Sequence, residues 1–275
     1  MRTQINLAKN AGFCFGVKRA IDIALKTAAI NKKVCILGDI VHNEDVVKKI
    51  GTAGIKKINR LSGSGKNKIL LIRAHGASKK IFDRARHLGY RIIDATCPMV
   101  HEIHRIAQQS ESKGYTIIVI GDKKHDEVRG IIGQLRKKAI VIESIADIPA
   151  KKIKKACVVV QSTQNMDKVD RIVSALKRRA GELKFFNTIC RPTTAKQQEI
   201  RSMPRQNDLM IIIGSHTSAN TKRLYEISRA INPRSFWVNS KKDIKAAWLQ
   251  GMKKVGLTTG ASTPDWRIKE VVGYI

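Results

Sequence analysis

Residues 94–100 read Asp94-Ala95-Thr96-Cys97-Pro98-Met99-Val100 and follow the β-branched pair Ile92-Ile93. Proline is compatible with the first turn of a helix but not with the middle of a strand, so the pattern predicts a strand-to-helix turn at Cys97. In open α/β sheets, the turns at the carboxyl ends of the strands carry the chemistry. We therefore expect Cys97 to belong to a functional site.

Two further cysteines lie in similar surroundings, beside glycine or proline. Cys14 stands in Gly12-Phe13-Cys14-Phe15-Gly16-Val17, and Cys190 follows Asn187-Thr188-Ile189 and precedes Arg191-Pro192. The helical periodicity after residue 17 predicts a helix that begins just after Cys14, where the helix dipole and free amide groups favour a thiolate. The other two cysteines, Cys35 and Cys157, lie inside apolar strand-like runs and are expected to be buried as small hydrophobic residues.

The composition sets limits on the class of protein. A chain of 275 residues with 43% hydrophobic residues can form one large domain or two to three small ones. No run of about 18 apolar residues occurs, and the N-terminal segment Met1–Asn6 has no apolar signal region. The five cysteines are an odd number and include no Cys-x-x-Cys pair, so we expect a cytoplasmic protein without disulfides.

The charge balance is strongly basic. Lys and Arg total 53 against 22 Asp and Glu, a formal net charge of +31. This charge attracts polyanions and acidic proteins over about 8 Å, the Debye length at physiological salt. Aromatic residues make up only 5%, and no stacking platform or recognition helix is evident. The charge therefore predicts a solvated face or an attractor for an acidic protein rather than a specific nucleic-acid site.

Strand-like apolar runs alternate with helical patterns along the chain, which predicts mainly parallel sheets whose carboxyl ends share one edge. With three cysteines recurring at spacings of 83 and 93 residues, we expect three small α/β units whose active edges face a common centre. Their predicted bounds are 1–96, 97–189 and 190–265, with 266–275 returning to the first unit. The predicted strands are 4–7, 34–38, 69–72, 115–120, 139–142, 156–160, 183–189, 209–213, 236–238 and 255–258.

The residues that follow these strands indicate the chemistry. Three cysteines that converge in a reducing compartment suit an iron–sulfur cluster, and a four-iron cluster on three thiolates leaves one iron open. Hydroxyl and amide clusters beside glycine suit a phosphate group, and histidine and glutamate can deliver protons. The pattern predicts a reductase of a small phosphorylated substrate, with candidates His42, His75, His125, Glu127, Ser162, Thr163, Ser218, Asn220 and Ser262.

Simpler interpretations compete with this one. A serine or threonine at a strand end is usually a helix cap, and Glu127 could serve only as a first-turn acid of the helix that follows it. A zinc-dependent hydrolase of a phosphorylated small molecule could use the same cysteines and histidines. A basic nucleic-acid-binding protein would explain the charge but none of the residues at the strand ends.

Nine motifs, in the same order along the chain, resemble those of the 4-hydroxy-3-methylbut-2-enyl diphosphate reductases, the LytB-type family. Each motif alone is weak evidence, but nine in register are specific. They are Gly12-Phe13-Cys14-Phe15-Gly16-Val17, Val41-His42-Asn43, Arg73-Ala74-His75-Gly76, Asp94-Ala95-Thr96-Cys97-Pro98, His125-Asp126-Glu127-Val128 with Gly130, Gln161-Ser162-Thr163-Gln164, Thr188-Ile189-Cys190, Ser218-Ala219-Asn220-Thr221 with Arg223-Leu224, and Gly260-Ala261-Ser262-Thr263-Pro264-Asp265.

The resemblance implies a trefoil of three α/β units around a [4Fe-4S] cluster held by Cys14, Cys97 and Cys190. It implies reductive removal of the substrate's hydroxyl to give isopentenyl and dimethylallyl diphosphate, the last step of the methylerythritol phosphate pathway. By position, the diphosphate would be held by His42, His75, Ser218, Ala219, Asn220 and Ser262. Near the substrate would lie His125, Ser162 and Thr163, and Glu127 would relay protons. An acidic electron donor, ferredoxin or flavodoxin, would supply the electrons.

Two positions depart from the family pattern. Ala219 stands where relatives often carry serine, so one hydroxyl is missing from the expected phosphate pocket while the backbone N–H remains. Ser162 replaces a frequent threonine and keeps the hydroxyl.

Overall fold

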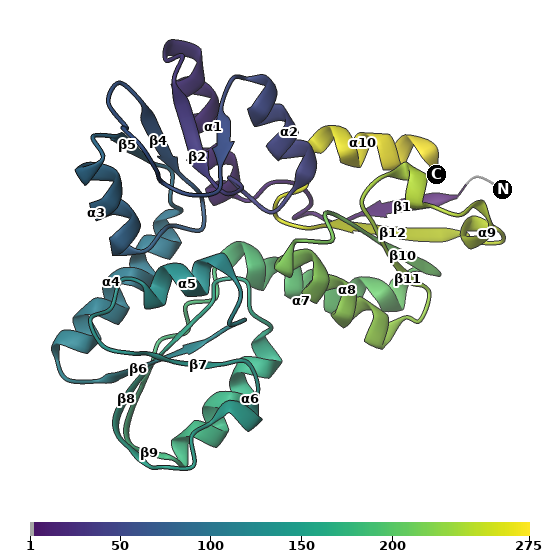
Figure 1. Cartoon of the computed structure of the whole chain (residues 1–275). Coiled ribbons are helices and arrows are strands. Elements are labelled where there is room, and N and C mark those ends of the chain that lie inside the picture. The colour runs from purple at the N-terminus through teal and green to yellow at the C-terminus, as the bar shows by residue number, and fades with distance from the viewer. Residues whose placement is uncertain (1–2) are drawn as a thin grey trace. The chain divides into compact units, whose positions relative to one another are not determined.

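The computed structural model describes residues 3–275 and contains three four-stranded sheets flanked by helices (Figure 1). Met1 and Arg2, which begin the segment expected to lack a signal region, lie outside the described residues. Throughout residues 3–275, the paired strands of all three sheets run parallel. The predicted fold class, an α/β protein with three small parallel sheets, is confirmed. Among the described helices, none is both long and apolar enough to cross a membrane.

The chain divides into two compact units, which we describe separately. Unit 1 contains the described residues up to Val17, the short segment His42–Val46 and the last part of the chain, Cys190–Ile275. Unit 2 contains Lys18–Val41 and Val47–Ile189.

Unit 1 is built on one sheet that joins the two ends of the chain. Apolar residues of the helices Arg191–Gln206 and Ala219–Ile231 pack on one set of strand side chains, and those of the helix Asp265–Tyr274 pack on the alternate set. The strand order is β1 (Gln4–Leu7), β12 (Lys254–Thr259), β10 (Leu209–Ile213) and β11 (Ser235–Val238), and the helices are α7 (Arg191–Gln206), α8 (Ala219–Ile231), α9 (Ala246–Leu249) and α10 (Asp265–Tyr274).

The position of β1 differs from our predicted boundaries, which grouped residues 4–7 with residues 34–96. In Figure 1, β1 lies beside β12, and Ile5 is paired with Val255. A four-residue strand carries no side-chain pattern that specifies its neighbour, so packing decides. Ile5 joins the core cluster of this sheet together with Val271 of α10.

Unit 2 contains the other two sheets. The first has the order β3 (Lys56–Ile58), β2 (Val34–Leu37), β4 (Ile69–Ile72) and β5 (Arg91–Asp94) and is accompanied by α1 (Phe15–Ile30), α2 (Glu44–Thr52) and α3 (Lys79–His87). The second has the order β7 (Ile140–Ile142), β6 (Thr116–Ile120), β8 (Ile153–Val160) and β9 (Ala180–Phe185), with α4 (Pro98–Ser112), α5 (Asp126–Ile132) and α6 (Met166–Lys177).

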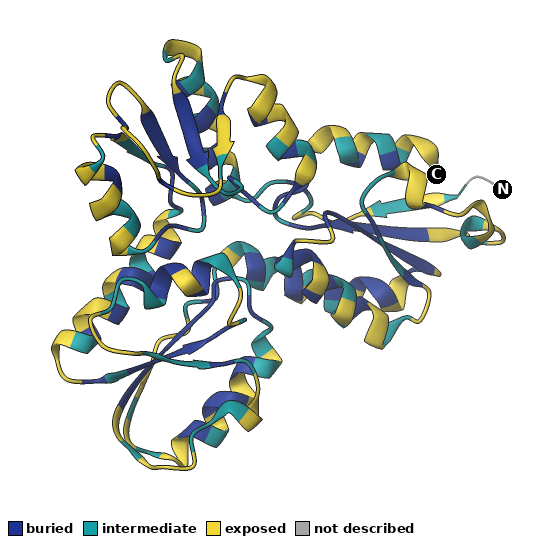
Figure 2. Ribbon diagram, viewed as in Figure 1, coloured by how far each residue is buried: buried dark blue, intermediate teal, exposed yellow. Residues whose placement is uncertain are grey.

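The central strands are buried on both faces, as parallel strands covered by helices must be (Figure 2). In the second sheet of unit 2, Ile118 and Val158 pack against α6, whereas their neighbours Ile117 and Val159 pack against α4 and α5. This two-sided burial explains why the strands appear in the sequence as continuous apolar runs rather than as alternating patterns.

One predicted strand ends earlier than expected. We predicted a strand over 183–189, but β9 ends at Phe185. The hydroxyl of Thr188 accepts a hydrogen bond from the backbone N–H of Val160 at 2.7 Å and donates one to the Val160 carbonyl at 2.5 Å. The Thr188 side chain thus binds the N–H and the carbonyl of Val160, which a further residue of β9 would need to continue the strand pairing. The chain therefore leaves the sheet before Cys190.

Candidate active site

The strand order places the candidate residues at equivalent positions in the three sheets. In each sheet the order changes direction between the two central strands, β2 and β4, β6 and β8, or β10 and β12. Ligands of open α/β sheets bind at the carboxyl ends of strands that flank such a reversal. The polar candidates follow these central strands, while the three cysteines follow edge strands β1, β5 and β9 along the chain.

Cys97 lies at the predicted strand-to-helix turn. It is the N-cap of α4, with Pro98 as the first helical residue, and it is half-buried. Its backbone N–H donates to the carbonyl of Ala74 at 3.0 Å, which joins this turn to the loop that carries His75. Arg19 of α1 donates to the carbonyl of Thr96 at 3.0 Å and braces the turn from the other side.

Cys14 lies in a loop of unit 1 between β1 and α1, directly before the first helical residue, as predicted. Its backbone N–H donates to the carbonyl of Ala261 at 3.0 Å, and the N–H of Gly12 donates to the hydroxyl of Thr259 at 2.7 Å. Gly12 has a φ of +89°, a conformation that a side chain would strain, so the glycine is needed for this turn.

Cys190 is the N-cap of α7, and its sulfur lies 3.1 Å from the hydroxyl of Thr193. Cys14, Cys97 and Cys190 are all partly accessible. Cys35 and Cys157 are buried, and burial raises the pKa of both thiols. The distinction that we predicted between the two groups of cysteines agrees with their burial.

Glu127 connects the two central strands of its sheet in unit 2. Its side chain, 1% exposed, accepts hydrogen bonds from the backbone N–H of Ser162 at 2.6 Å and from the Ser162 hydroxyl at 2.7 Å. The carboxylate therefore bonds across to the end of β8. The simpler interpretation, a first-turn acid that only caps α5, does not describe these contacts.

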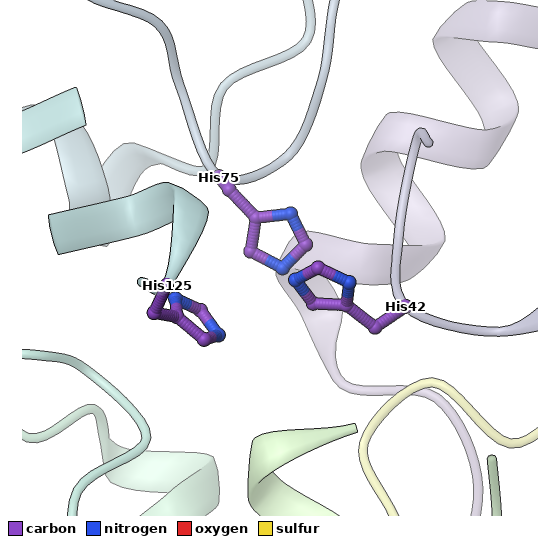
Figure 3. Close-up of side chains that lie close together, drawn as sticks. All are labelled: His42, His75 and His125. Carbon is purple, nitrogen blue, oxygen red and sulfur yellow. The ribbon is translucent and has the colours of Figure 1, made fainter. Parts of the chain in front are cut away.

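His125 is the N-cap of α5, and its Nδ1 accepts from the backbone N–H of Glu127 at 3.2 Å. The ring nitrogen that remains, Nε2, therefore carries the proton in the neutral imidazole. His75 from the loop after β4 meets His125 edge to face, with ring centroids 5.6 Å apart (Figure 3). The structure thus brings together His75, His125, Glu127 and Ser162.

Thr163 takes a different partner from Ser162. Its hydroxyl accepts from the side-chain amide of Gln161 at 2.9 Å, and the other end of that amide accepts from the backbone N–H of Asp122 at 2.9 Å. Gln161, fully buried, therefore holds the ends of β6 and β8 together. We had noted Gln161 only as part of a motif and did not predict this role.

The candidate phosphate residues of unit 1 lie at the start of α8 and after β12. Ser218 caps α8 by accepting from the N–H of Thr221 at 3.2 Å, so the capping interpretation holds for its oxygen. Asn220 is 4% exposed, and neither atom of its side-chain amide has a hydrogen-bond partner among residues 3–275. The hydroxyl of Ser262 donates to the carbonyl of His42 at 3.1 Å.

Buried amide groups without partners are rare, because leaving them unpaired costs about 1–3 kcal/mol. The helix N-terminus and the amide of Asn220 together offer hydrogen-bond donors at one place in unit 1. Ala219, the first residue of α8, contributes its backbone N–H but no hydroxyl to this group.

The sequence reasoning missed Lys196 of α7. Its side chain is 2% exposed, and burial lowers its pKa to about 8, although Cys14 and Glu199 oppose the shift. The signal was present in the sequence, because Lys196 falls on the helical spacing of the buried residues Thr193, Ile200 and Met203. We had counted it only as part of the net charge.

These features define a parallel α/β protein with one accessible thiol after an edge strand of each sheet. Histidine, glutamate, hydroxyl and amide side chains follow the central strands. A family model described as "LytB protein" matches residues 5–275. The chain therefore belongs to the LytB protein family, and the resemblance identified from the nine motifs is confirmed.

Two similar relatives of this chain carry the same name. The 4-hydroxy-3-methylbut-2-enyl diphosphate reductase of Trichlorobacter lovleyi is 40% identical and that of Geobacter metallireducens 39%, each over 275 residues. The alignments cover 99% of this chain and 97% and 96% of those relatives.

Two solved structures are also similar to this one. A structure of (E)-4-hydroxy-3-methyl-but-2-enyl diphosphate reductase, described as the terminal enzyme of the non-mevalonate pathway, has a TM-score of 0.74, 36% identity and 99% coverage of both chains. The E-1-hydroxy-2-methyl-but-2-enyl-4-diphosphate reductase of Plasmodium falciparum has a TM-score of 0.92 and 31% identity, with 99% of this chain and 88% of that chain covered.

His104 packs beside Gly76 of the loop that carries His75 and beside Gly130 of α5. It lies on α4 and is 7% exposed, and methyl groups added at Gly76 and Gly130 would come within 3.0 Å and 3.6 Å of its ring. The same methyl at Gly130 would lie 3.3 Å from the carbonyl oxygen of His75. The two glycines thus let α4, α5 and the His75 loop pack closely around the imidazole.

This packing makes stability depend on pH. Burial, with a smaller contribution from neighbouring His101 and opposed by Asp94, lowers the pKa of His104 from 6.5 to about 4. Between these values the unfolded chain binds a proton that the folded protein does not, so stability falls as the pH falls from 6.5 to 4. The expected loss is about 3 kcal/mol.

Urea unfolding of the metal-free protein at several pH values, compared with the His104→Gln variant, measures this contribution. The variant should lose less stability than the wild type across the window, and replacing the exposed His87 by Gln should leave the wild-type slope unchanged. Equal slopes for His104→Gln and the wild type would contradict the assignment.

Proposed function

We propose that this chain is a 4-hydroxy-3-methylbut-2-enyl diphosphate reductase. It would remove the substrate's hydroxyl group as water, using two electrons and two protons, and yield isopentenyl and dimethylallyl diphosphate. This reaction is the last step of the methylerythritol phosphate pathway. The observation that carries the proposal is the similarity to relatives with this name along essentially the whole chain.

The cysteines present fit a three-thiolate iron–sulfur cluster. None of the five forms a disulfide, and only Cys14, Cys97 and Cys190 combine partial accessibility with a position directly before a helix, where a thiolate is favoured. We propose these three as the ligands of a [4Fe-4S] cluster. When bound, such a cluster would pass the donor's electrons to the substrate and would have one iron without a protein ligand. Free thiols of this kind also suit the reducing cytoplasm.

The residues proposed to bind the diphosphate are those that the family resemblance implies by position. In unit 1, the start of α8 offers the backbone N–H of Ala219, the hydroxyl of Ser218 and the amide of Asn220. Phosphate groups bind well at helix N-termini, where free N–H groups and the helix dipole both favour negative charge. We propose that Ser262, His42 and His75 complete this set. Bonds to the substrate would give the buried amide of Asn220 the partners it lacks in the protein.

Proton delivery would depend on Glu127. Its carboxylate is buried and holds the hydroxyl of Ser162, so a proton on Glu127 can reach the substrate through that hydroxyl. The N–H of Ser162 fixes the orientation of the carboxylate. Thr163, held by Gln161, would lie near the substrate's own hydroxyl, and His125 would line the site.

The positive charge suits an acidic electron donor. Lys151, Lys152 and Lys154 are exposed on and before β8, where they can attract a protein of opposite charge. We propose ferredoxin or flavodoxin as the donor and no specific nucleic-acid site, because charge complementarity raises the rate of encounter without requiring sequence recognition.

Replacement of Cys97 tests the cluster. Anaerobically purified wild-type protein should be brown and contain about four irons and four sulfides per chain. Cys97→Ser should lose the colour and at least 99% of diphosphate reduction, because serine is a poor ligand for a soft cluster. The matched control is Cys35→Ser, at a buried thiol that donates to the carbonyl of Ile69 at 3.3 Å, and it should keep both. Zinc without iron in the wild type would contradict the proposal.

Replacement of Glu127 tests the proton path. Glu127→Gln keeps an oxygen that accepts from Ser162, so cluster content and substrate binding should remain, while turnover should fall about 100-fold or more. Single-turnover kinetics and substrate titration separate the two effects. Glu102 of α4, whose side chain is 43% exposed and pairs with Arg105, is changed to Gln as the control and should turn over normally. Near-normal turnover of Glu127→Gln would remove this residue from the proton path.

A further inference from the structure

The buried side chain of Lys196 holds the loop that carries Cys14. Its ammonium group donates to three backbone carbonyls of unit 1, those of Asn10, Gly12 at 3.3 Å and Thr259 at 3.1 Å. A lysine ammonium has three N–H donors, so all of them are used. The side chain reaches these carbonyls from α7, whose N-cap is Cys190.

Glu199, one turn further along α7, binds the same loop through its N–H groups. One carboxylate oxygen accepts from the backbone N–H of Lys9 at 2.5 Å. The other accepts from the backbone N–H and the side-chain amide of Asn10, both at 3.2 Å. The helix therefore holds the carbonyls of Asn10 and Gly12 and the backbone N–H groups of Lys9 and Asn10.

We propose that Lys196 and Glu199 are positioning residues that fix the loop carrying Cys14 to the helix that begins at Cys190, so that these two thiols are in place before any metal binds. The positioning itself stands on the contacts within unit 1. Only the statement that the thiols hold a metal rests on the proposed function.

Two physical arguments support the role. A buried ammonium group is tolerated only when its hydrogen bonds are satisfied, so moving the loop away would leave a buried charge with unused donors. Ligands that are already held in position also lose less conformational freedom when a cofactor binds. Beyond β1 the loop has only scattered backbone bonds, such as that from the N–H of Cys14 to the carbonyl of Ala261, so side chains supply much of this constraint.

The test uses the metal-free full-length protein. Cys14 and Cys97 are alkylated with iodoacetamide and followed by mass spectrometry, and backbone amide exchange is measured for residues 9–14. Lys196→Met keeps the length of the side chain but removes its donors. We expect it to raise the alkylation rate of Cys14 and the exchange of residues 9–14 about tenfold, with the rate at Cys97 unchanged.

Further variants separate positioning from general destabilisation. Glu199→Gln should act in the same direction, and Lys196→Arg should restore protection because a guanidinium also donates to carbonyls. Arg205→Met, which removes an exposed cation from the same helix, should match the wild type. The buried thiols of Cys35 and Cys157 report global unfolding. If they become labelled in Lys196→Met, that variant has unfolded globally, and the labelling rate of Cys14 in Glu199→Gln then tests the proposal.

Wild-type protection of Cys14 in both Lys196→Met and Glu199→Gln would overturn the proposal. So would equal labelling of Cys14 in Lys196→Met and Lys196→Arg.

Reconstitution with iron and sulfide then gives a separate result. Failure of the wild type to take up iron would overturn the proposed function and leave the labelling result standing. Retarded uptake in Lys196→Met alone, by about tenfold, supports preorganisation of the two thiols.

Discussion

Parallel pairing of the strands is the constraint on which the rest of this structure depends. Parallel neighbours end at the same edge of a sheet, and each is followed by a crossover, usually a helix. Every sheet therefore collects strand ends and helix N-termini along one edge. The first turn of a helix leaves backbone N–H groups without partners inside the helix, so this edge offers donors to side chains and to ligands. Thiolates and phosphates both benefit from that environment.

The three sheets use this edge in the same way. Each has a cysteine after an edge strand along the chain, and the loop before or at that cysteine bonds to the last residue of the neighbouring strand or to the loop that follows it. Cys14 N–H donates to Ala261, Cys97 N–H donates to Ala74, and the Thr188 hydroxyl binds both backbone groups of Val160. The next residues along those neighbouring loops include the polar candidates Ser262, His75 and Ser162. The similar spacings of the three cysteines thus reflect one arrangement that is repeated three times.

Local sequence patterns predicted most of the strands and turns but only part of the strand pairing and of the long-range contacts. Apolar runs, glycines and prolines predicted the central strands and the turns at Cys14 and Cys97, because these depend on neighbours in the chain. The partner of β1 and the end of β9 depend on contacts with residues far away in the sequence, Val255 and Val160. The bond between Glu127 and Ser162 spans 35 residues and decides whether Glu127 caps a helix or joins two strands. Local pattern carries no information on such contacts.

Burial also decides what a lysine does in this chain. Most of the basic residues that produce the +31 charge are exposed, where water solvates them and their effect is long-range attraction. Lys196 has the same chemistry but is 2% exposed and meets three carbonyls. In that environment a charge is favourable only in one geometry, so it specifies the position of the loop around it. A count of charges does not distinguish the exposed lysines from Lys196. The helical spacing that Lys196 shares with buried residues does distinguish it.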